Sequence, residues 1–190
     1  MRTATEIIDA FPARYPLLGA AAGQLLMNTV AATTGDYVEI GSAWGGSAVM
    51  AALAMEGRPG TVYCIDAFAP THELSGIDGT LLAFWANCLA FGVQERIVAF
   101  KQHHPPWPLP IWHHKFSVGL IDGAHEAPFP AQDWKGMSPR VTDYILMDNV
   151  ERPAVKDVVD SSDWTTTTTV EHSSAQRPDK LSTIALLRRP

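Results

Sequence analysis

The chain has 190 residues, of which 46% are hydrophobic and 18% are charged. A chain of this length and composition can bury the core of one ordinary domain, which excludes a disordered, collagen-like or coiled-coil protein. Its 14 Lys and Arg residues against 20 Asp and Glu residues leave a formal net charge of −6, which argues against a protein that binds nucleic acid. We therefore expect a single domain over residues 1–190 with no nucleic-acid partner.

Strands and helices alternate along most of the chain. Apolar residues at helical spacing predict a helix at 16–33, so residues 1–34 are expected to form a helical cap before a sheet core at 35–190. The elements that follow are a strand at 36–41, a helix at 45–56, a strand at 61–66, a helix at 80–91, strands at 96–101 and 116–122, a helix at 131–137, a strand at 143–148 and a helix at 155–161. This alternation predicts an α/β fold with a doubly wound, mostly parallel sheet.

Two segments depart from this pattern. The β-branched run 165–170 and the apolar run 182–187 are separated by a polar turn with no room for a crossover helix, so we expect an antiparallel hairpin that completes seven strands. At 103–114, four prolines within 105–110 forbid an α-helix and predict a loop. We expect Trp107 and Trp112 in this loop to cover a cofactor or substrate, or to pack against another subunit.

The first predicted strand runs into a glycine-rich turn. Ligands of doubly wound sheets bind beyond the carboxyl ends of the strands, and the turn Glu-Ile-Gly-x-x-x-Gly-Gly-Ser at 39–47 stands at such a place, before a helix N-terminus. Glycines let a ligand approach the backbone closely, although a purely structural turn can have the same composition. The spacing differs from the dinucleotide fingerprint Gly-x-Gly-x-x-Gly, and the turn lacks the lysine of a nucleoside triphosphate site.

Acidic and amide side chains stand at the ends of three further strands. Asp66 closes the second strand about 20 residues after the glycine turn, where a carboxylate can accept the hydroxyls of an adenosine ribose. Asp122 ends the fourth strand, and Asp148 and Asn149 end the fifth. These three oxygen donors suit a hard divalent cation such as Mg²⁺. The alternative for each residue is a cap or a turn, which Asp and Asn also favour.

Together these motifs resemble a known family. Val-Glu-Ile-Gly-x-x-x-Gly-x-Ser at 38–47, Asp66, Ile-Asp-Gly-Ala-His at 121–125 and Met-Asp-Asn at 147–149 resemble the class I S-adenosylmethionine (SAM)-dependent methyltransferases. More narrowly, they are similar to the metal-dependent O-methyltransferases of catechol and caffeoyl-CoA type and their small bacterial relatives. The resemblance spans roughly residues 36–149, and it agrees with the C-terminal hairpin, which that family places at one edge of a Rossmann-like sheet.

The resemblance implies a binding site for SAM. The residues that it assigns to the methionine part and its turn are Glu39, Gly41, Ser42, Gly45 and Ser47. The residues that it assigns to the adenosine part are Asp66 for the ribose, Ala67 and Phe68 beside the adenine, and Gln102 and His103 near the adenine amino group. Asp122 is also assigned a contact with the amino group of the cofactor.

The resemblance also implies a metal and a base. Asp122, Asp148 and Asn149 match the family's ligands for Mg²⁺ or another divalent cation. The catechol-type enzymes have a lysine three residues beyond the first of these, which takes the proton from the substrate hydroxyl, and this chain has His125 there. Because an imidazole is a competent base near neutral pH, we expect His125 and Asp122 to be catalytic. The alternative is a histidine that hydrogen-bonds to a backbone carbonyl or to Glu126.

The sequence therefore predicts methyl transfer from SAM to a hydroxyl of a small molecule. Two alternatives stay open, a metal-independent methyltransferase and a non-catalytic cofactor-binding partner in a natural-product pathway, while the glycine spacing disfavours an NAD-dependent dehydrogenase. The acceptor is expected to contact residues 1–15, 71–79 and the proline loop. We expect a cytoplasmic protein, because no stretch approaches the roughly 20 apolar residues that cross a bilayer, with a homodimer as the default assembly.

Two other residue types carry weaker signals. The histidine pairs at 103–104 and 113–114 lack the helical spacing or cysteine partners of a zinc site, so we do not expect zinc. Cys64 and Cys88 are too few for a disulfide framework or a metal cluster, and we expect both to be reduced core residues.

Overall fold

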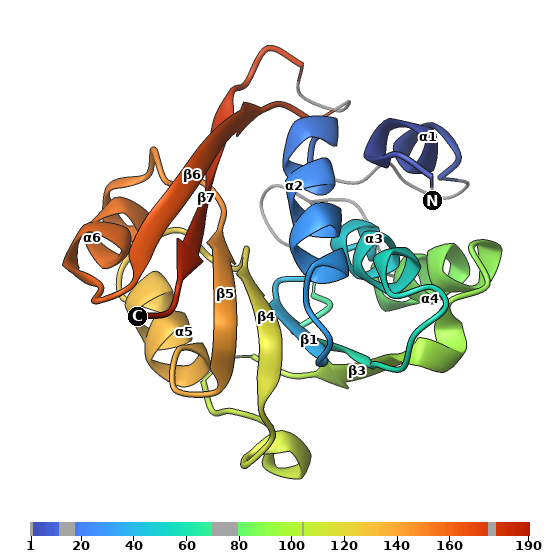
Figure 1. Cartoon of the computed structure of the whole chain (residues 1–190), viewed down its shortest axis with the longest axis horizontal. Helices are drawn as coiled ribbons and strands as arrows, with labels where there is room; N and C mark the ends of the chain where they lie inside the picture. Colours follow the sequence, from blue (N-terminus) through green and yellow to red (C-terminus); the bar gives the residue numbers. More distant parts are fainter. Residues whose placement is uncertain (1, 12–17, 70–79, 104, 175–177) are drawn as a thin grey trace.

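A computed structural model describes residues 2–11, 18–69, 80–103, 105–174 and 178–190, and its strands form one seven-stranded sheet in the order β3-β2-β1-β4-β5-β7-β6 (Figure 1). The strands are β1 Tyr37–Ile40, β2 Val62–Asp66, β3 Ile97–Lys101, β4 Phe116–Ile121, β5 Val141–Met147, β6 Thr165–His172 and β7 Ser182–Arg188. The pairs from β3 to β5 are parallel, while β7 runs antiparallel to β5 and β6. This arrangement confirms the predicted α/β class and the C-terminal hairpin.

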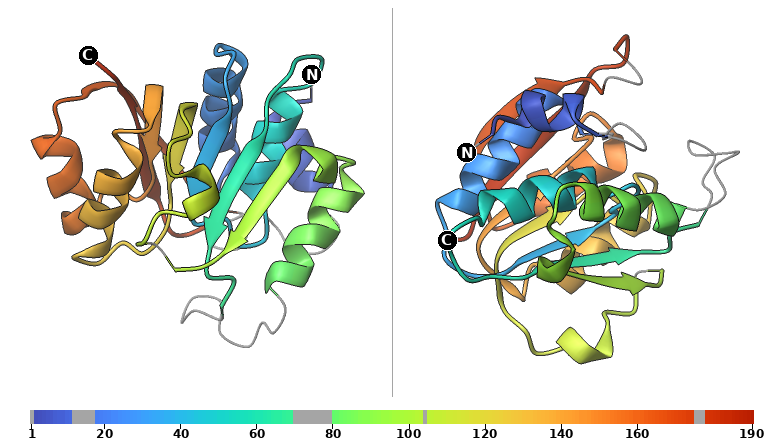
Figure 2. Two further views of the ribbon diagram at one scale, coloured as in Figure 1. Left: turned by 90° about the horizontal axis from the view of Figure 1, so that it is seen from below. Right: turned by 90° about the vertical axis from the view of Figure 1, so that its right-hand side faces the viewer.

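Helices cover both faces of the sheet (Figure 2). The helices on one face are α1 Ala4–Asp9, α2 Ala20–Ala31, α3 Gly46–Ala54 and α4 Thr80–Ala90, and those on the other are α5 Phe129–Met137 and α6 Pro153–Ser161. Two short 3-10 helices are η1 Gln94–Arg96 and η2 Leu109–Ile111. Helix α1 was not predicted as a separate element, although Thr3 and Glu6 form a capping box at its start. In the described ranges, no helix is long and apolar enough to cross a membrane.

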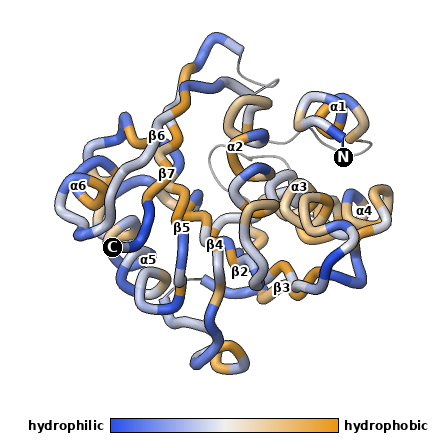
Figure 3. The backbone as a smooth tube through the Cα atoms, in the orientation of Figure 1, coloured by the Kyte–Doolittle hydropathy of each residue, from blue (hydrophilic) through white to orange (hydrophobic). Residues whose placement is uncertain are grey.

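The central strands are buried on both sides, which explains why they read as continuous apolar runs. In β1, Tyr37 packs into the core under α1 to α4, whereas Val38 and Ile40 pack into the core under α5 and α6. Figure 3 shows the mainly hydrophobic residues of α3 and α4 beside the sheet. Cys64 and Cys88 are buried free thiols of the first core, as predicted.

The strand order reverses between β1 and β4, which are neighbours in the sheet although two strands separate them in the chain. Such a reversal opens a crevice beyond the carboxyl ends of the two strands. Gly41 stands there with φ of +91°, and a Cβ atom on it would lie 2.1 Å from the carbonyl oxygen of Asp122. Only glycine therefore lets the two strand ends approach each other.

Candidate functional site

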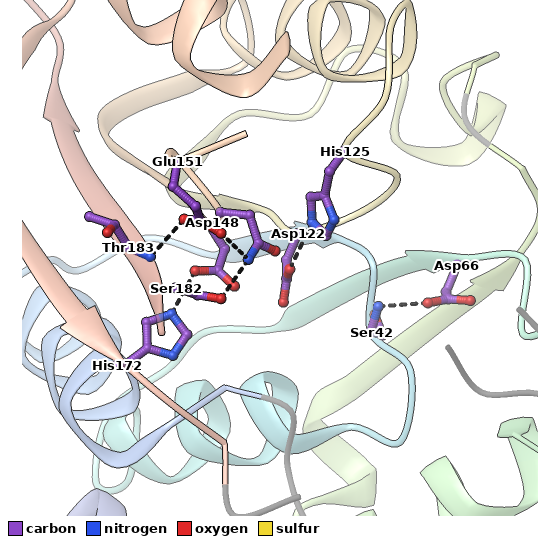
Figure 4. Close-up of polar contacts among 10 residues, drawn as sticks. Ser42, Asp66, Asp122, His125, Asp148, Glu151, His172, Ser182 and Thr183 are labelled. Carbon is purple, nitrogen blue, oxygen red and sulfur yellow. Dashed lines mark hydrogen bonds and ion pairs between the residues drawn. The ribbon is translucent and has the colours of Figure 1, made fainter. Parts of the chain in front are cut away.

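A cleft of about 680 Å³ opens beyond the carboxyl ends of β1, β2, β4 and β5, and the ends of the β6–β7 hairpin also line it. The sequence-predicted residues that line it are Gly41, Ser42, Ser47, Asp66, Ala67, Gln102, His103, Asp122, His125, Asp148 and Asn149. Figure 4 shows that Asp66 and the Asp122–Asp148 pair lie at separate parts of this site. The acceptor segment expected at 71–79 lies outside the described residues.

Three predicted cofactor residues do not reach the cleft. Phe68 has left-handed backbone, with φ of +48°, and its ring packs edge-on against Phe84 with 5.2 Å between ring centroids. Gly45 is the N-cap of α3, and a Cβ atom on it would lie 2.9 Å from the Phe84 ring. The ring of Phe68 therefore packs against α4 instead of facing the cleft, and Gly45 lies between Trp44 and Gly46, which do line it.

Glu39 is the third, and it lies beneath the glycine turn. The side chain is fully buried, and its Oε2 accepts a hydrogen bond of 2.9 Å from the hydroxyl of Tyr37. Burial raises the pKa of Glu39, while the nearby hydroxyl groups of Ser42, Ser47 and Tyr37 act in the opposite direction. Glu39 therefore supports the glycine turn from the core and does not face the cleft.

Asp66 ties the glycine turn to the end of β2. Its Oδ2 accepts backbone N–H groups of Ser42 at 2.7 Å and Ala43 at 2.9 Å, and its Oδ1 accepts the N–H of Phe68 at 2.5 Å. A carboxylate has about four acceptor positions, so these bonds leave capacity for a ligand hydroxyl. Asp66 thus acts as a turn cap and still lines the cleft, which combines the two interpretations offered by its sequence position.

Asp122 and Asp148 form an acidic pair. The N–H of Asp148 donates to the carbonyl of Ile121, which brings the ends of β4 and β5 together, and the two carboxyl groups lie close to each other (Figure 4). Burial and then the neighbouring Asp148 carboxylate raise the pKa of Asp122 to about 7, against the opposing effects of His125 and His172. The raised pKa shows that a second negative charge is unfavourable here, so the pair favours a proton or a bound cation.

Asn149 completes a set of oxygen donors. Its backbone is left-handed, with φ of +59°, and its Nδ2 donates to Ser182 Oγ at 2.8 Å and to Glu151 Oε1 at 3.2 Å. Among the described residues, neither Asn149 Oδ1 nor Asp148 Oδ2 has a hydrogen-bond partner. Within the described ranges, no group of three or more His, Cys, Asp and Glu residues is arranged to hold a metal ion. A cation would therefore depend on the Asn149 amide together with the two carboxylates, and this donor set fits a hard divalent ion.

His125 stands beside this pair. Its Nε2 lies 3.5 Å from Asp122 Oδ1, too far for a strong hydrogen bond, and its side chain is 20% exposed. The two residues are three apart on the turn after β4, and both line the cleft. Figure 4 shows the imidazole directed at the Asp122 carboxyl group.

Four charged or titratable residues of the cleft were not predicted as site residues from the sequence. These are Asp133, Arg152, His172 and Lys180. His172 is buried, and its Nε2 lies 2.7 Å from Asp148 Oδ1. The pairing of His172 with Ser182 in the hairpin places His172 at the same edge of the sheet as Asp148. The hairpin register could therefore have indicated His172, but the predicted strand ended at residue 170. Asp133, also buried, lies on α5 behind Gly123.

The tryptophans of the proline loop lie elsewhere. Trp107 is buried against Phe116 at the amino end of β4, with 6.2 Å between ring centroids. The guanidinium of Arg140, the residue before β5, lies 5.0 Å from the ring of Trp112. Neither tryptophan lines the cleft, so the expectation that they cover a cofactor or substrate is wrong. His114 also lies at the amino end, bonded to Asp36 at 2.6 Å.

Replacing Asp122 with asparagine should stabilise the protein at pH 8 without divalent cations. Because the raised pKa of Asp122 reflects a penalty on its charged form, its contribution to stability is present below about pH 4 and is lost as the pH rises through about 7. Because the neutral amide of asparagine avoids this loss, we expect the free energy of unfolding to rise by about 2–4 kcal/mol at pH 8 and by much less at pH 4. Urea unfolding at several pH values measures the difference. The exposed Asp143→Asn is the control, and a benefit that does not grow with pH would contradict the assignment.

Comparisons with known proteins identify the fold. No family model and no curated protein matches the sequence. Among solved structures, the O-methyltransferase from Bacillus cereus in complex with SAH is 12% identical over 98% of this chain and 90% of its own, with a TM-score of 0.61. The O-methyltransferase TomG from Streptomyces achromogenes, which acts in tomaymycin synthesis and was solved with SAM, is 16% identical over 97% of this chain and 88% of its own, with a TM-score of 0.59.

A third similar structure is that of a protein named for another kind of substrate, RNA. A candidate RNA methyltransferase from Pyrococcus horikoshii is 13% identical over 99% of this chain and 96% of its own, with a TM-score of 0.60. At such identities the likeness shows the fold alone, which is the Rossmann-like α/β fold that these methyltransferases share. The absence of a nucleic-acid partner therefore stays a prediction from the net charge.

Proposed function

We propose that this protein transfers a methyl group from SAM to a hydroxyl oxygen of a small molecule. The observation that carries the proposal is that one cleft holds the glycine turn after β1, the Asp66 carboxylate and the Asp122–Asp148 pair. The similar folds of proteins solved with SAH and SAM support the proposal. The turn and Asp66 would bind the cofactor, and the acidic pair would lie beside the reacting groups.

The protein's part in this reaction is positioning. SAM supplies an electrophilic methyl group when it is bound, and an acceptor oxygen held in line with it can displace the sulfur without covalent help from the protein. Asp66 would accept a ribose hydroxyl while its bonds to Ser42 and Ala43 keep the turn in shape. Gly41 and Ser47 would let the methionine part lie against the start of α3.

Asp122, Asp148 and Asn149 would hold a divalent cation. A bound cation lowers the pKa of an adjacent hydroxyl group, so that an oxyanion exists near neutral pH. Asp148 Oδ2 and Asn149 Oδ1 have no hydrogen-bond partner among the described residues, which supports this assignment. The raised pKa of Asp122 supports it too, because a cation would relieve the repulsion between the two carboxylates.

His125 would accept the proton of the acceptor hydroxyl. We expect His125→Ala to lower turnover by about 100-fold near pH 7, since a general base contributes roughly that much. The loss should shrink at high pH, where the acceptor ionises without help. A pH profile of kcat for both proteins measures this, with His113→Ala, an exposed histidine of the proline loop, as the control. An equal loss at every pH would exclude the base role.

Binding and turnover experiments test the whole proposal. Calorimetry should show that SAM and SAH bind while NAD does not. Transfer of labelled methyl groups to a panel of small hydroxylated compounds should then occur with Mg²⁺ and fall to background in EDTA. Binding of NAD in place of SAM would contradict the proposal.

The two alternatives give different results in the same experiments. A metal-independent methyltransferase, in which Asp122 touches only the cofactor and Asp148 and Asn149 are turn residues, keeps its activity in EDTA. A non-catalytic cofactor-binding partner binds SAM tightly and methylates nothing in the panel. Arg152 and Lys180 also line the cleft, so the panel should include acceptors that carry a carboxylate beside the hydroxyl.

A further inference from the structure

His172 connects three parts of the molecule that are distant in sequence. It is the last residue of β6, it pairs with Ser182 at the start of β7, and it lies under the N-terminus of α2. Its side chain is buried, with a residue exposure of 6%, and it lines the cleft. Figure 4 shows its imidazole directed at Asp148.

The hydrogen-bond partners of the ring favour one of the two neutral tautomers of His172. The backbone N–H of Gly19 lies 3.3 Å from Nδ1 of His172, and an amide N–H can only donate, so Nδ1 must present its lone pair. In a neutral imidazole the single N–H is then at Nε2. That N–H points at Asp148 Oδ1, 2.7 Å away, and donates to it.

We propose that His172 is a positioning residue: Gly19 selects its Nε2–H tautomer, and that N–H holds one oxygen of Asp148 so that the other faces the cleft. This inference rests on the proposed function, because the proposed function assigns Asp148 as a ligand of a divalent cation. The free oxygen, Oδ2, has no hydrogen-bond partner among the described residues. Any other rotamer of Asp148 would break its short, buried hydrogen bond to His172. Such a loss is costly where water cannot replace the bond.

The contact between Gly19 and β6 is itself close-fitted. A Cβ atom on Gly19 would lie 2.3 Å from the carbonyl oxygen of Ser173, the residue after His172. This N-cap position of α2 has ordinary extended backbone, with φ of −72°, so the need for glycine comes from the approach and not from strain. The start of α2 and the end of β6 therefore meet in one arrangement, which sets the distance between the Gly19 amide and the imidazole.

Binding of Mn²⁺ to the full chain, followed by electron paramagnetic resonance, tests the positioning role. His172→Leu removes the donor to Asp148 and should weaken Mn²⁺ binding by about 10-fold or more. His172→Gln can place an amide N–H near the position of Nε2, and it should restore binding to within about threefold of wild type. SAH affinity, measured by calorimetry, should stay unchanged in both variants, which shows that each is folded.

A second histidine–aspartate pair provides the matched control. His114 and Asp36 are bonded at 2.6 Å at the amino end of the sheet, away from the cleft. His114→Leu should leave Mn²⁺ affinity unchanged even where it lowers the melting temperature. If a general loss of stability weakened Mn²⁺ binding, both His172→Leu and His114→Leu would show it. If the cause is the position of Asp148, only His172→Leu should bind Mn²⁺ more weakly.

Nitrogen-15 NMR of the histidine rings tests the tautomer without any ligand. The signals of His172 are assigned by their loss in His172→Gln, and long-range proton couplings should show the proton at Nε2. A proton at Nδ1 would overturn the proposal. So would a folded His172→Leu that binds Mn²⁺ as tightly as wild type, with the proposed function intact. Wild-type protein that binds no Mn²⁺ would overturn both this inference and the proposed cation.

Discussion

Replacement of Asp148 with alanine should abolish metal-stimulated methyl transfer while SAM still binds. The variant loses one carboxylate of the acidic pair and leaves the N–H of His172 without its acceptor. Because cation stabilisation of a developing oxyanion is worth several kcal/mol, we expect turnover to fall by about 100-fold or more. The glycine turn and Asp66 lie at a separate part of the cleft, so SAM affinity should change by less than about threefold. Transfer assays over a range of Mg²⁺ concentrations, with calorimetry for SAM, measure the two effects.

Asp160→Ala is a suitable control for this experiment. Asp160 lies on α6 in an exposed ion pair with Lys156, 59% exposed, and it does not line the cleft. Its loss should leave both turnover and binding as in wild type, since exposed pairs contribute little. An Asp148→Ala protein as active as the parent would show that the acidic pair takes no part in transfer.

Replacement of Asp66 with alanine should weaken SAM binding by about 10-fold or more. The change removes the proposed ribose acceptor, and it also releases the N–H groups of Ser42 and Ala43, so the glycine turn loses its attachment to β2. Both effects act on the same ligand, and the loss of free energy should exceed that of one ordinary hydrogen bond. Calorimetric titration with SAM and SAH measures it.

Two comparisons make the Asp66 result specific. Asp66→Asn keeps one acceptor oxygen and should bind SAM with intermediate affinity. Asp143→Ala changes an exposed carboxylate near the amino end of β5 and should have no effect. Unchanged SAM affinity in a folded Asp66→Ala protein would remove Asp66 from the cofactor site.

Much of this fold follows from local patterns. Strands buried on both faces give continuous apolar runs, and the residues that end them fall at one edge of the sheet whatever the exact packing. This is why Asp66, Asp122 and Asp148 could be assigned to one cleft from their positions after strands. The C-terminal hairpin was equally readable, because its two runs left no room for a crossover helix.

The missed features depend on tertiary packing. The approach of His172 to Asp148 follows from the register of β6 against β7, which a run of threonines does not specify well. The ring of Phe68 packs against Phe84 and its backbone is left-handed, a conformation that nothing in the sequence requires of a phenylalanine. Trp112 packs near Arg140 through contacts between segments that are 28 residues apart.

The cleft also illustrates a conflict between stability and function. Asp122 and Asp148 are held close together although their charges repel, and the fold carries this cost at neutral pH. Similar costs are common at binding sites, where the ligand relieves what the free protein cannot. The stabilising effect expected of Asp122→Asn and the inactivation expected of Asp148→Ala are two consequences of the same arrangement.

A crystal structure of the protein grown with SAH and Mn²⁺, with anomalous data collected for manganese, tests the central claim most directly. We predict that the ribose of SAH lies against Asp66 and that the anomalous peak lies beside Asp122, Asp148 and Asn149. SAH bound outside the cleft, or a manganese peak away from these three residues, would contradict the account.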